Sequence, residues 1–367
     1  MGNDKKTIIL HDTFLYKGGG ERLIMMMGKA LKADIASGFF SAGSFDLRKE
    51  GFEGKMIPVS SEIFKKGFRH LKLKWAFLFN TSFLKKYDNI IFSGDCISAQ
   101  RNCRKDAKKI YYCHTPPRYI YDLHDLYLKK VPTLLKPAFK IFCFIFKIMY
   151  EKDVKNMDLV LTNSINTQKR IKKFLGIDSL VLYPPVDLDK FKFIGQKDYY
   201  LSFARLSDAK RVDKIVEAFK LIPDKKLLVI YGENDPQRQK IFDLAKGQEN
   251  IKFVTLPGNV GFTDYVGNSI ATIYIPIDED FGMSPVESMA RGKPVIGVNE
   301  GGLKESIIDG KTGILINAEA KIEDIVKAVN ELSSEKAISM RADCEKRASD
   351  FSLENFSEEI NNILKKL

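Results

Sequence analysis

The sequence predicts an α/β protein of two doubly wound halves, each with a parallel sheet covered by helices on both faces. Two observations predict this fold. Short, continuously apolar strands alternate with helical segments, and the alternation starts again after a polar stretch near residue 190. A chain of 367 residues with 44% hydrophobic and 29% charged residues is long enough for two domains and has the composition of a globular protein.

The first half begins with the apolar run TIILH, which leads through a glycine-containing loop into the amphipathic segment ERLIMMMGKALK at 21–32. This order predicts a strand, a loop and a helix. Comparable apolar runs, each short enough for a buried strand, follow along this half. Strands are predicted at 7–11, 88–94, 108–114, 158–164 and 179–185.

The second half repeats the pattern after the polar segment 186–198. Its first strand is followed by RVDKIVEAFKLI at 211–222, whose apolar spacing predicts a helix. We therefore expect one domain over 1–190, a second over 191–350, and a final helix over 351–367 that can cross back to the first domain. Strands are predicted at 198–204, 226–232, 251–256, 271–277 and 293–298.

The net charge of +12 is unevenly distributed. Residues 1–200 contain 36 Lys and Arg against 20 Asp and Glu, whereas residues 201–367 contain 23 against 27. A basic first half suits an anionic ligand or an anionic membrane surface. Its basic residues are spread among hydrophobic helices and are not combined with aromatic stacking motifs, so nucleic acid is not an expected partner.

The five cysteines are scattered and show no CxxC spacing, which disfavours both a zinc site and a disulfide framework. No apolar stretch approaches the roughly 18 residues that a membrane span needs. The start, MGNDKKTIIL, lacks the apolar region of a secretory signal. We therefore expect a reduced, cytoplasmic protein.

Two glutamates, Glu279 and Glu287, surround the turn FGMSP in the second half. Glu279 follows an apolar strand, at the sheet edge where open α/β folds bind ligands, and the next helix offers backbone N–H groups to a phosphate. Glu287 also has a purely structural explanation, because Ser284 as N-cap with Glu287 three residues later forms a capping box. Carboxylates beside a phosphate site suit a ligand with phosphate and hydroxyl groups, such as a nucleotide sugar.

Four further side chains follow predicted strands. Arg205 and Lys210, in FARLSDAKR, can neutralise a diphosphate, although each alone is equally well explained as a solvated surface charge. His114 precedes two prolines that fix its loop, and His11 is a weaker candidate at another strand end. The glycine run 18–20 lets a backbone approach a ligand but lacks the dinucleotide fingerprint, so NAD is not expected.

Together these residues resemble the retaining glycosyltransferases of family four, which have the GT-B fold of two facing Rossmann-like domains. The resemblance covers nearly the whole chain and rests on EDFGMSPVESMARGKPVIG followed by GGLKE, and on GGGER, HTPPRY and YPPVD. YYCHTPPRYIYD is most similar to bacterial mannosyltransferases that build O-antigen or related surface polysaccharide. The resemblance implies hexosyl transfer from GDP-mannose. A UDP-hexose is the alternative donor, because YGENDPQ departs from the family pattern near the expected base.

The resemblance also implies a role for each site residue. Glu279 would hold hydroxyls of the donor sugar, Glu287 the ribose, and His114 the sugar near the anomeric centre. Arg205 and Lys210 would stabilise the departing diphosphate. The further donor-binding residues would be Gly19, Gly20, Phe281, Gly282, Met283 and Ser284.

Neither a metal nor another cofactor is expected. The segment DED at 278–280 contains the Asp-x-Asp pattern with which other glycosyltransferases hold a divalent ion on the diphosphate. Arg205, Lys210 and the N-terminus of the following helix already supply positive charge for that group. We therefore predict a metal-independent reaction.

Two basic, aromatic-rich stretches of the first half, 62–80 and 136–152, predict helices that lie on the inner face of the cytoplasmic membrane. The first contains Lys74, Trp75 and Phe77 among its lysines and aromatic residues. Such a surface would bring the protein to a lipid-linked saccharide acceptor.

The second stretch has a structural alternative, in which IFCFIF packs into the core and the lysines are merely solvated. Lys140 and Lys147 are seven residues apart, which places both on one helical face. Two other functions stay open from the sequence: a non-catalytic basic membrane-binding module, and a nucleotide-sugar epimerase on the same fold.

Overall fold

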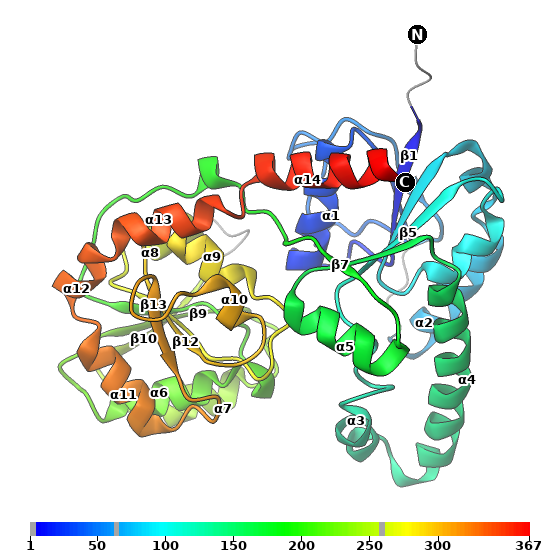
Figure 1. Ribbon diagram of the computed structural model, residues 1–367. Coiled ribbons are helices and arrows are strands. Elements are labelled where there is room, and N and C mark those ends of the chain that lie inside the picture. The colour runs from blue at the N-terminus through cyan, green and yellow to red at the C-terminus, as the bar shows by residue number, and fades with distance from the viewer. Residues whose placement is uncertain (1–4, 62–65, 257–260) are drawn as a thin grey trace. The chain divides into compact units, whose positions relative to one another are not determined.

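The computed structural model describes residues 5–61, 66–256 and 261–367, and the chain divides into two compact units (Figure 1). Unit 1 comprises Met1–Pro184 and Phe356–Leu367, and unit 2 comprises Pro185–Asn355. Residues 62–65 of the first basic, aromatic-rich stretch lie outside the described part. Each unit contains one parallel sheet with helices, which confirms the predicted α/β fold class.

Unit 1 has a seven-stranded parallel sheet in the order β3-β2-β1-β4-β5-β6-β7. Residues 8–10 of β1 and 90–92 of β4 are fully buried, because helices cover both faces of the sheet and leave no solvated side. The strand order reverses between β1 and β4, and doubly wound sheets bind ligands at the carboxyl ends of the strands beside such a reversal. The strands are β1 (Thr7–His11), β2 (Asp34–Ser37), β3 (Met56–Pro58), β4 (Asn89–Ser93), β5 (Lys108–Cys113), β6 (Leu159–Thr162) and β7 (Leu180–Val181).

The helices of unit 1 carry clear local signals. Ser164 caps α5 by accepting a hydrogen bond from the N–H of Thr167, and Gly176 ends the helix with a left-handed φ of 68°. The final helix, α14, belongs to unit 1 from Phe356 onward and lies beside α1 (Figure 1). The helices are α1 (Gly19–Ala30), α2 (Lys66–Phe79), α3 (His124–Lys130), α4 (Lys136–Lys155), α5 (Ile165–Leu175) and α14 (Leu353–Lys366).

Unit 2 has a six-stranded parallel sheet in the order β10-β9-β8-β11-β12-β13, which reverses between β8 and β11. Its strands are β8 (Tyr200–Ser202), β9 (Leu227–Tyr231), β10 (Ile251–Thr255), β11 (Thr272–Tyr274), β12 (Val295–Val298) and β13 (Gly313–Ile316). Its helices are α6 (Val212–Lys220), α7 (Arg238–Leu244), α8 (Phe262–Gly267), α9 (Met283–Met289), α10 (Leu303–Ser306), α11 (Ile322–Glu331), α12 (Ser334–Ser339) and α13 (Arg341–Ser349).

Some strands differ from the sequence prediction. The predicted strand 179–185 is only two residues long, as β7, because Pro184 and Pro185 have no N–H to donate to a neighbouring strand. β2 and β3 were not predicted, since DIAS and MIP are too short to show a clear apolar pattern.

Candidate active site

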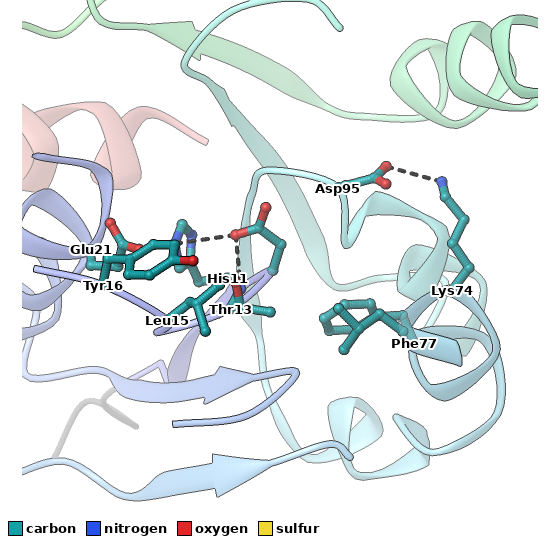
Figure 2. A pocket seen from close by; sticks show the side chains of 10 residues that line it. His11, Thr13, Leu15, Tyr16, Glu21, Lys74, Phe77 and Asp95 are labelled. Atoms are coloured by element: carbon teal, nitrogen blue, oxygen red, sulfur yellow. Dashed lines mark hydrogen bonds and ion pairs between the residues drawn. The ribbon is translucent and has the colours of Figure 1, made fainter. Parts of the chain in front are cut away.

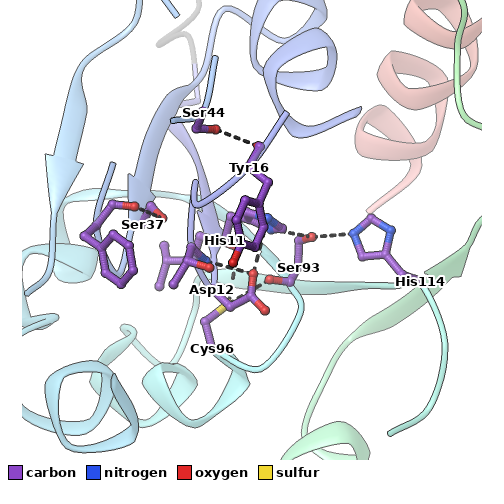
Figure 3. Close-up of polar contacts among 11 residues, drawn as sticks. His11, Asp12, Tyr16, Ser37, Ser44, Ser93, Cys96 and His114 are labelled. Atoms are coloured by element: carbon purple, nitrogen blue, oxygen red, sulfur yellow. Dashed lines mark hydrogen bonds and ion pairs between the residues drawn. The ribbon is translucent and has the colours of Figure 1, made fainter. Parts of the chain in front are cut away.

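Three polar side chains meet at the strand-order reversal of unit 1. His11 ends β1, Ser93 ends β4, and His114 follows β5. His11 Nδ1 lies 3.1 Å from Ser93 Oγ, which lies 2.7 Å from His114 Nε2 (Figure 3). Burial, with a smaller contribution from the His11 ring, lowers the pKa of His114 to about 4. His114 is therefore neutral near neutral pH and can exchange hydrogen bonds without carrying charge.

The glycine run 18–20 begins a helix, whereas the sequence predicted a loop there. Gly18 is the N-cap of α1, and Gly19 and Gly20 are its first two residues. A Cβ atom on Gly20 would lie 3.9 Å from Cε1 of His114. The structure thus brings two predicted site features, the glycine run and His114, together at one sheet edge.

A cavity of about 370 Å³ lies beside His11 (Figure 2). Its polar wall contains carboxylates of Asp12, Glu21 and Asp95, and Lys74 pairs with Asp95 at 2.9 Å. Burial raises the pKa of the Glu21 carboxyl above its usual range. Carboxylates set against an apolar wall suit a saccharide, which offers hydroxyl donors and apolar ring faces. The other residues that line the cavity are Thr13, Leu15, Tyr16, Leu73 and Phe77.

Sequence reasoning missed this set of carboxylates. Asp12 directly follows β1, and Asp95 follows β4 after Gly94, so a strand-end signal was present. What the sequence did not supply was the strand order, which makes β1 and β4 neighbours although about 80 residues separate them.

In unit 2, Lys210, Glu279 and Tyr274 form one cluster at the strand-order reversal. Lys210 Nζ donates to Glu279 Oε2 and, at 2.7 Å, to the hydroxyl of Tyr274. Tyr274 is at the end of β11, and burial followed by the Glu279 carboxylate raises its pKa well above the ordinary value. Two of the predicted site residues, 69 positions apart in the chain, are therefore in direct contact.

Glycines hold the loop that carries Glu279. Gly282 has a φ of 85°, which glycine adopts readily, and it lets the chain turn from the loop into α9. The GGLKE segment packs against the same loop, where the N–H of Gly302 donates to the carbonyl of Glu279 at 2.8 Å. A Cβ atom on Gly301 would lie 2.5 Å from that carbonyl oxygen. The glycine pair is thus part of the support for Glu279.

Arg211 supports the loop from the other side and was not predicted from the sequence. Its guanidinium donates to the carbonyl oxygens of Ile275 and Pro276, at 2.7 and 2.9 Å, and to that of Ala318 at 2.7 Å. Burial lowers the pKa of Arg211, yet three carbonyl partners compensate for the charge. The loop before Glu279 is held by backbone contacts that no sequence spacing reveals.

The capping box that the sequence allowed is absent from the described contacts. α9 begins at Met283 with Gly282 as N-cap, so Ser284 is the second helical residue. Its carbonyl accepts from the hydroxyl of Ser288. Glu287 is buried on α9 with 6% exposure, and Phe281, with 2%, packs against Phe351. The structural explanation for Glu287 was wrong, because the helix starts two residues earlier than a Ser284 cap requires.

Arg205 does not join the Lys210 cluster. It lies after β8 with a side chain 70% exposed, and its closest carboxylate is Asp235 at 3.8 Å. Asp235 also accepts the backbone N–H groups of Leu206 and Gly232, which fixes the turn after β9. The structure therefore places Arg205 and Lys210 in one loop but with different partners.

The α3–α4 surface of unit 1 is rich in exposed apolar and basic side chains. The predicted core alternative for IFCFIF holds only in part: Cys143 and Phe146 are buried, whereas the other members face solvent. We define the α3–α4 surface by Leu126, Tyr127, Lys129, Lys130, Leu134, Leu135, Lys140, Ile141, Phe142, Phe144, Ile145, Lys147 and Ile148, all exposed.

In the first basic, aromatic-rich stretch, two of the side chains predicted to lie on such a surface, Lys74 and Phe77, are turned away from solvent. Phe77 is in the core at 1% exposure, and Lys74 lies over the ring of Phe146 while pairing with Asp95. Trp75 is exposed and stacks on Phe79. Helical periodicity explains the difference between Trp75 and Phe77, because residues two positions apart point roughly 200° apart around a helix.

Two searches cover the described part of the chain. Within residues 5–61, 66–256 and 261–367, no group of three or more His, Cys, Asp or Glu side chains is arranged to hold a metal ion. None of the helices described there is long and apolar enough to cross a bilayer.

Comparison with solved structures defines the class. Sucrose-phosphate synthase from Thermosynechococcus elongatus matches with a TM-score of 0.77, over 99% of both chains, at 14% identity. At that identity the similarity shows the fold alone, which is the GT-B fold of two Rossmann-like domains, as predicted.

Sequence comparison then gives the family. The family model described as "Glycosyl transferases group 1" matches residues 186–351. Alpha-1,3/1,6-mannosyltransferase ALG2 of Dictyostelium discoideum is 30% identical over 335 residues, which cover 77% of this chain and 76% of that protein. The mouse GDP-Man:Man(3)GlcNAc(2)-PP-Dol alpha-1,2-mannosyltransferase is 26% identical over 61% of this chain and 51% of that protein. The chain belongs to the group 1 glycosyl transferases, the retaining GT-B enzymes.

The predicted family and the predicted enzyme class, a glycosyltransferase, are thereby confirmed. The ALG2 relatives come from eukaryotes, so they do not support the predicted similarity to bacterial O-antigen enzymes.

Proposed function

We propose that this enzyme transfers mannose from GDP-mannose to a lipid-linked saccharide. The observation that carries the proposal is the contact of Lys210, Glu279 and Tyr274 at the strand-order reversal of unit 2. It combines a cation for a diphosphate with a carboxylate for sugar hydroxyls. The names of the relatives supply the finer chemistry, since ALG2 is named a mannosyltransferase and the mouse relative is named for GDP-Man and a PP-Dol-linked saccharide.

Unit 2 binds the donor in this proposal. Glu279 accepts hydrogen bonds from hydroxyls of the mannose, and Glu287 accepts those of the ribose. Phe281, Gly282, Met283 and Ser284 form the turn and first helical residues that line the sugar and phosphate. Support comes from the glycine contacts and from Arg211, which together hold this loop in one conformation.

Arg205 and Lys210 stabilise the negative charge that develops on the departing diphosphate. Lys210 has three N–H donors, and Tyr274 and Glu279 take two of them among the described contacts. The third can reach a phosphate oxygen without breaking the cluster. Arg205 is exposed, and the 3.8 Å to its carboxylate partner is longer than a hydrogen bond. It can therefore reorient toward an incoming phosphate at small cost. Such stabilisation of a leaving group is usually a large part of transfer catalysis.

Unit 1 binds the acceptor in this proposal. The cavity beside His11 offers Asp12, Glu21 and Asp95 to saccharide hydroxyls and an apolar wall to the ring faces. His114, with Gly19 and Gly20 at the start of α1, contacts the donor sugar near the anomeric carbon. Transfer then depends on holding the acceptor hydroxyl in a productive orientation.

The α3–α4 surface attaches the enzyme to the inner, anionic face of the cytoplasmic membrane, where a lipid-linked acceptor resides. Its exposed Phe142, Phe144 and Ile145 can enter the headgroup region, while Lys140 and Lys147 contact anionic lipid. Each basic residue near such a surface contributes on the order of 1 kcal/mol, so attachment is sensitive to salt. Synthesis of a cell-surface polysaccharide remains the context that the sequence predicts for this reaction.

The donor is tested by thermal shift and by transfer. GDP-mannose at about 100 times its dissociation constant should stabilise the enzyme by roughly 2.7 kcal/mol, and it should support transfer to a lipid-linked saccharide. The ligands tested beside GDP-mannose are GDP, UDP, UDP-glucose and UDP-galactose. Stabilisation and transfer with a UDP-hexose but not with GDP-mannose would replace the proposed donor. Conversion of a nucleotide sugar without any acceptor would point to an epimerase.

Membrane attachment is tested by flotation with vesicles that contain anionic lipid, at low and high salt. Charge reversal of four exposed lysines of the α3–α4 surface should abolish flotation and lower activity on a lipid-linked acceptor. The variant combines Lys129→Glu, Lys130→Glu, Lys140→Glu and Lys147→Glu. The matched control reverses four exposed lysines of unit 2, with Lys220→Glu, Lys246→Glu, Lys252→Glu and Lys311→Glu. Equal flotation of both variants would remove the α3–α4 surface from the proposal.

A further inference from the structure

An ion-pair contact and two hydrogen bonds link Asp12 to His114. Asp12 Oδ1 lies 3.2 Å from His11 Nε2, His11 Nδ1 lies 3.1 Å from Ser93 Oγ, and Ser93 Oγ lies 2.7 Å from His114 Nε2 (Figure 3). The four residues come from the carboxyl ends of three adjacent strands, β1, β4 and β5. His11 and Ser93 are 5% and 0% exposed, so solvent has little access to the two middle links.

The chemistry of each group determines which partner donates the hydrogen in each contact. The Asp12 carboxylate, 3.2 Å from His11 Nε2, attracts the proton of a neutral His11 to that nitrogen, and Nδ1 is then an acceptor. Ser93 then donates its single hydrogen to His11 Nδ1, and its oxygen accepts from Nε2–H of His114. The second nitrogen of His114, Nδ1, is left with a lone pair.

We propose that Asp12 sets the tautomer of His114 through His11 and Ser93, so that His114 Nδ1 is a hydrogen-bond acceptor for a ligand hydroxyl. Asp12, His11 and Ser93 are positioning residues in this arrangement, and His114 is the residue that touches the ligand. The identity of that ligand, the donor sugar, rests on the proposed function.

Three observations support this direction. The N–H of Thr13 donates to Asp12 Oδ1 at 2.8 Å, which anchors the carboxylate. Gly94 has a φ of 81°, and a Cβ atom there would come within 2.8 Å of the Asp12 carboxylate, so the glycine leaves room for it. A Cβ atom on Gly20 would lie 3.9 Å from Cε1 of His114, the carbon between the two ring nitrogens, so the glycine leaves space beside the ring.

The low pKa of His114, about 4, is consistent with the arrangement. A neutral imidazole has a tautomer to set, whereas a cationic ring donates from both nitrogens. The charged and titratable groups near the two rings include Asp12, Glu21 and Tyr112, together with each ring for the other.

The test is ¹⁵N NMR of histidine-labelled enzyme without ligand, because the ring nitrogens report the tautomer directly. The chain has only four histidines, so each resonance can be assigned with a His→Gln variant. Spectra are taken at a pH at which the ¹⁵N shifts show His11 to be neutral. A cationic His11 would donate from Nδ1 to Ser93 and so reverse the hydrogen bonds that reach His114. The wild type should show His114 protonated on Nε2. An Nδ1–H pattern would overturn the proposal.

Four variants decide whether Asp12 is the cause. Asp12→Ala should move His114 toward a mixture of tautomers, whereas Asp12→Asn, whose carbonyl still accepts, should keep the wild-type pattern. Asp95→Ala removes another carboxylate of the same cavity and should leave His114 unchanged. In the background of Ser93→Ala, Asp12→Ala should no longer affect His114. An unchanged His114 spectrum in Asp12→Ala, a mixture in Asp12→Asn, or an effect that persists in the Ser93→Ala background would each overturn the proposal.

Kinetics separate this proposal from the proposed function. Asp12→Ala should lower kcat/KM about tenfold, the usual effect of one neutral hydrogen bond, and Asp12→Asn should largely restore it. If the tautomer changes in Asp12→Ala while kcat/KM does not, the tautomer assignment stands and the proposed contact between His114 and the donor sugar fails. If the NMR result is negative, the tautomer proposal fails even when GDP-mannose is confirmed as donor.

Discussion

Substitution of Gly301 by alanine tests whether the glycine pair positions Glu279. The new Cβ atom would lie 2.5 Å from the carbonyl oxygen of Glu279 and 2.8 Å from its nitrogen, whereas ordinary contacts begin at 3.4 Å. The difference, 3.4 − 2.5, requires the loop to move by about 0.9 Å. Misplacement of a binding group by about 1 Å can cost roughly 10²-fold in rate.

Gly310→Ala is the matched control. Both glycines have left-handed φ values, 60° at Gly301 and 72° at Gly310, so either alanine costs about 1–2 kcal/mol of backbone strain. Within 4 Å of a Cβ atom on Gly310 there is nothing to clash with. Gly301→Ala should therefore lose a further 1–3 kcal/mol or so in urea denaturation, and about 10²-fold in kcat/KM. Equal kcat/KM values for the two variants would refute the reasoning.

Three further predictions concern charges in unit 2. Glu279→Ala should abolish most transfer while the melting temperature changes by only about 2–4 °C, because a partly exposed ion pair contributes about 1 kcal/mol or less. Differential scanning fluorimetry and a transfer assay check these two effects. A variant that still transfers would show that Glu279 is not part of the site. Transfer should persist in excess EDTA, because Arg205 and Lys210 supply the positive charge; loss of turnover that magnesium or manganese restores would contradict this. Burial lowers the pKa of Lys293 to about 8, below the ordinary 10.5. Between pH 8 and 10.5 the unfolded chain therefore holds a proton that the folded chain has lost. The free energy of unfolding rises with pH in this range, by at most about 1.4 kcal/mol per pH unit. Lys293→Met should lose that rise in urea denaturation, and an unchanged pH dependence would show that Lys293 does not cause it.

The sequence was most informative where one property repeats along a segment. The apolar runs of β1 and β4 and the helical spacing of α6 predicted these elements, because burial on both faces or on one face imposes a visible pattern. β2 and β3 escaped, since four and three residues are too few for any pattern. The start of α9 was predicted two residues late, because a glycine with a φ of 85° ended the turn without a side-chain cap.

In the candidate site, too, some residues could be predicted from the sequence and others could not. Glu279, Lys210 and His114 were identified as strand-end residues, but the contact between Lys210 and Glu279 depends on β8 and β11 being neighbours. Asp12 and Ser93 also lie at strand ends, but short polar residues are common there, so this position alone did not single them out. Their significance arises from pairing in space, which depends on a strand order that the sequence alone does not specify.

The position of α14 has a consequence for biosynthesis. Unit 2 is contiguous in the chain, so all of it has been translated before residues 356–367 are made. Unit 1 is the first to begin and the last to be completed, since Asn361 and Leu364 of α14 share a groove with Ala30 and Leu31 at the end of α1. Domains generally fold as units during synthesis, with the N-terminal one first. Here the nascent N-terminal domain must wait until residues 356–367 have been translated, and a product that stops before residue 356 would lack part of that domain while its second domain was intact.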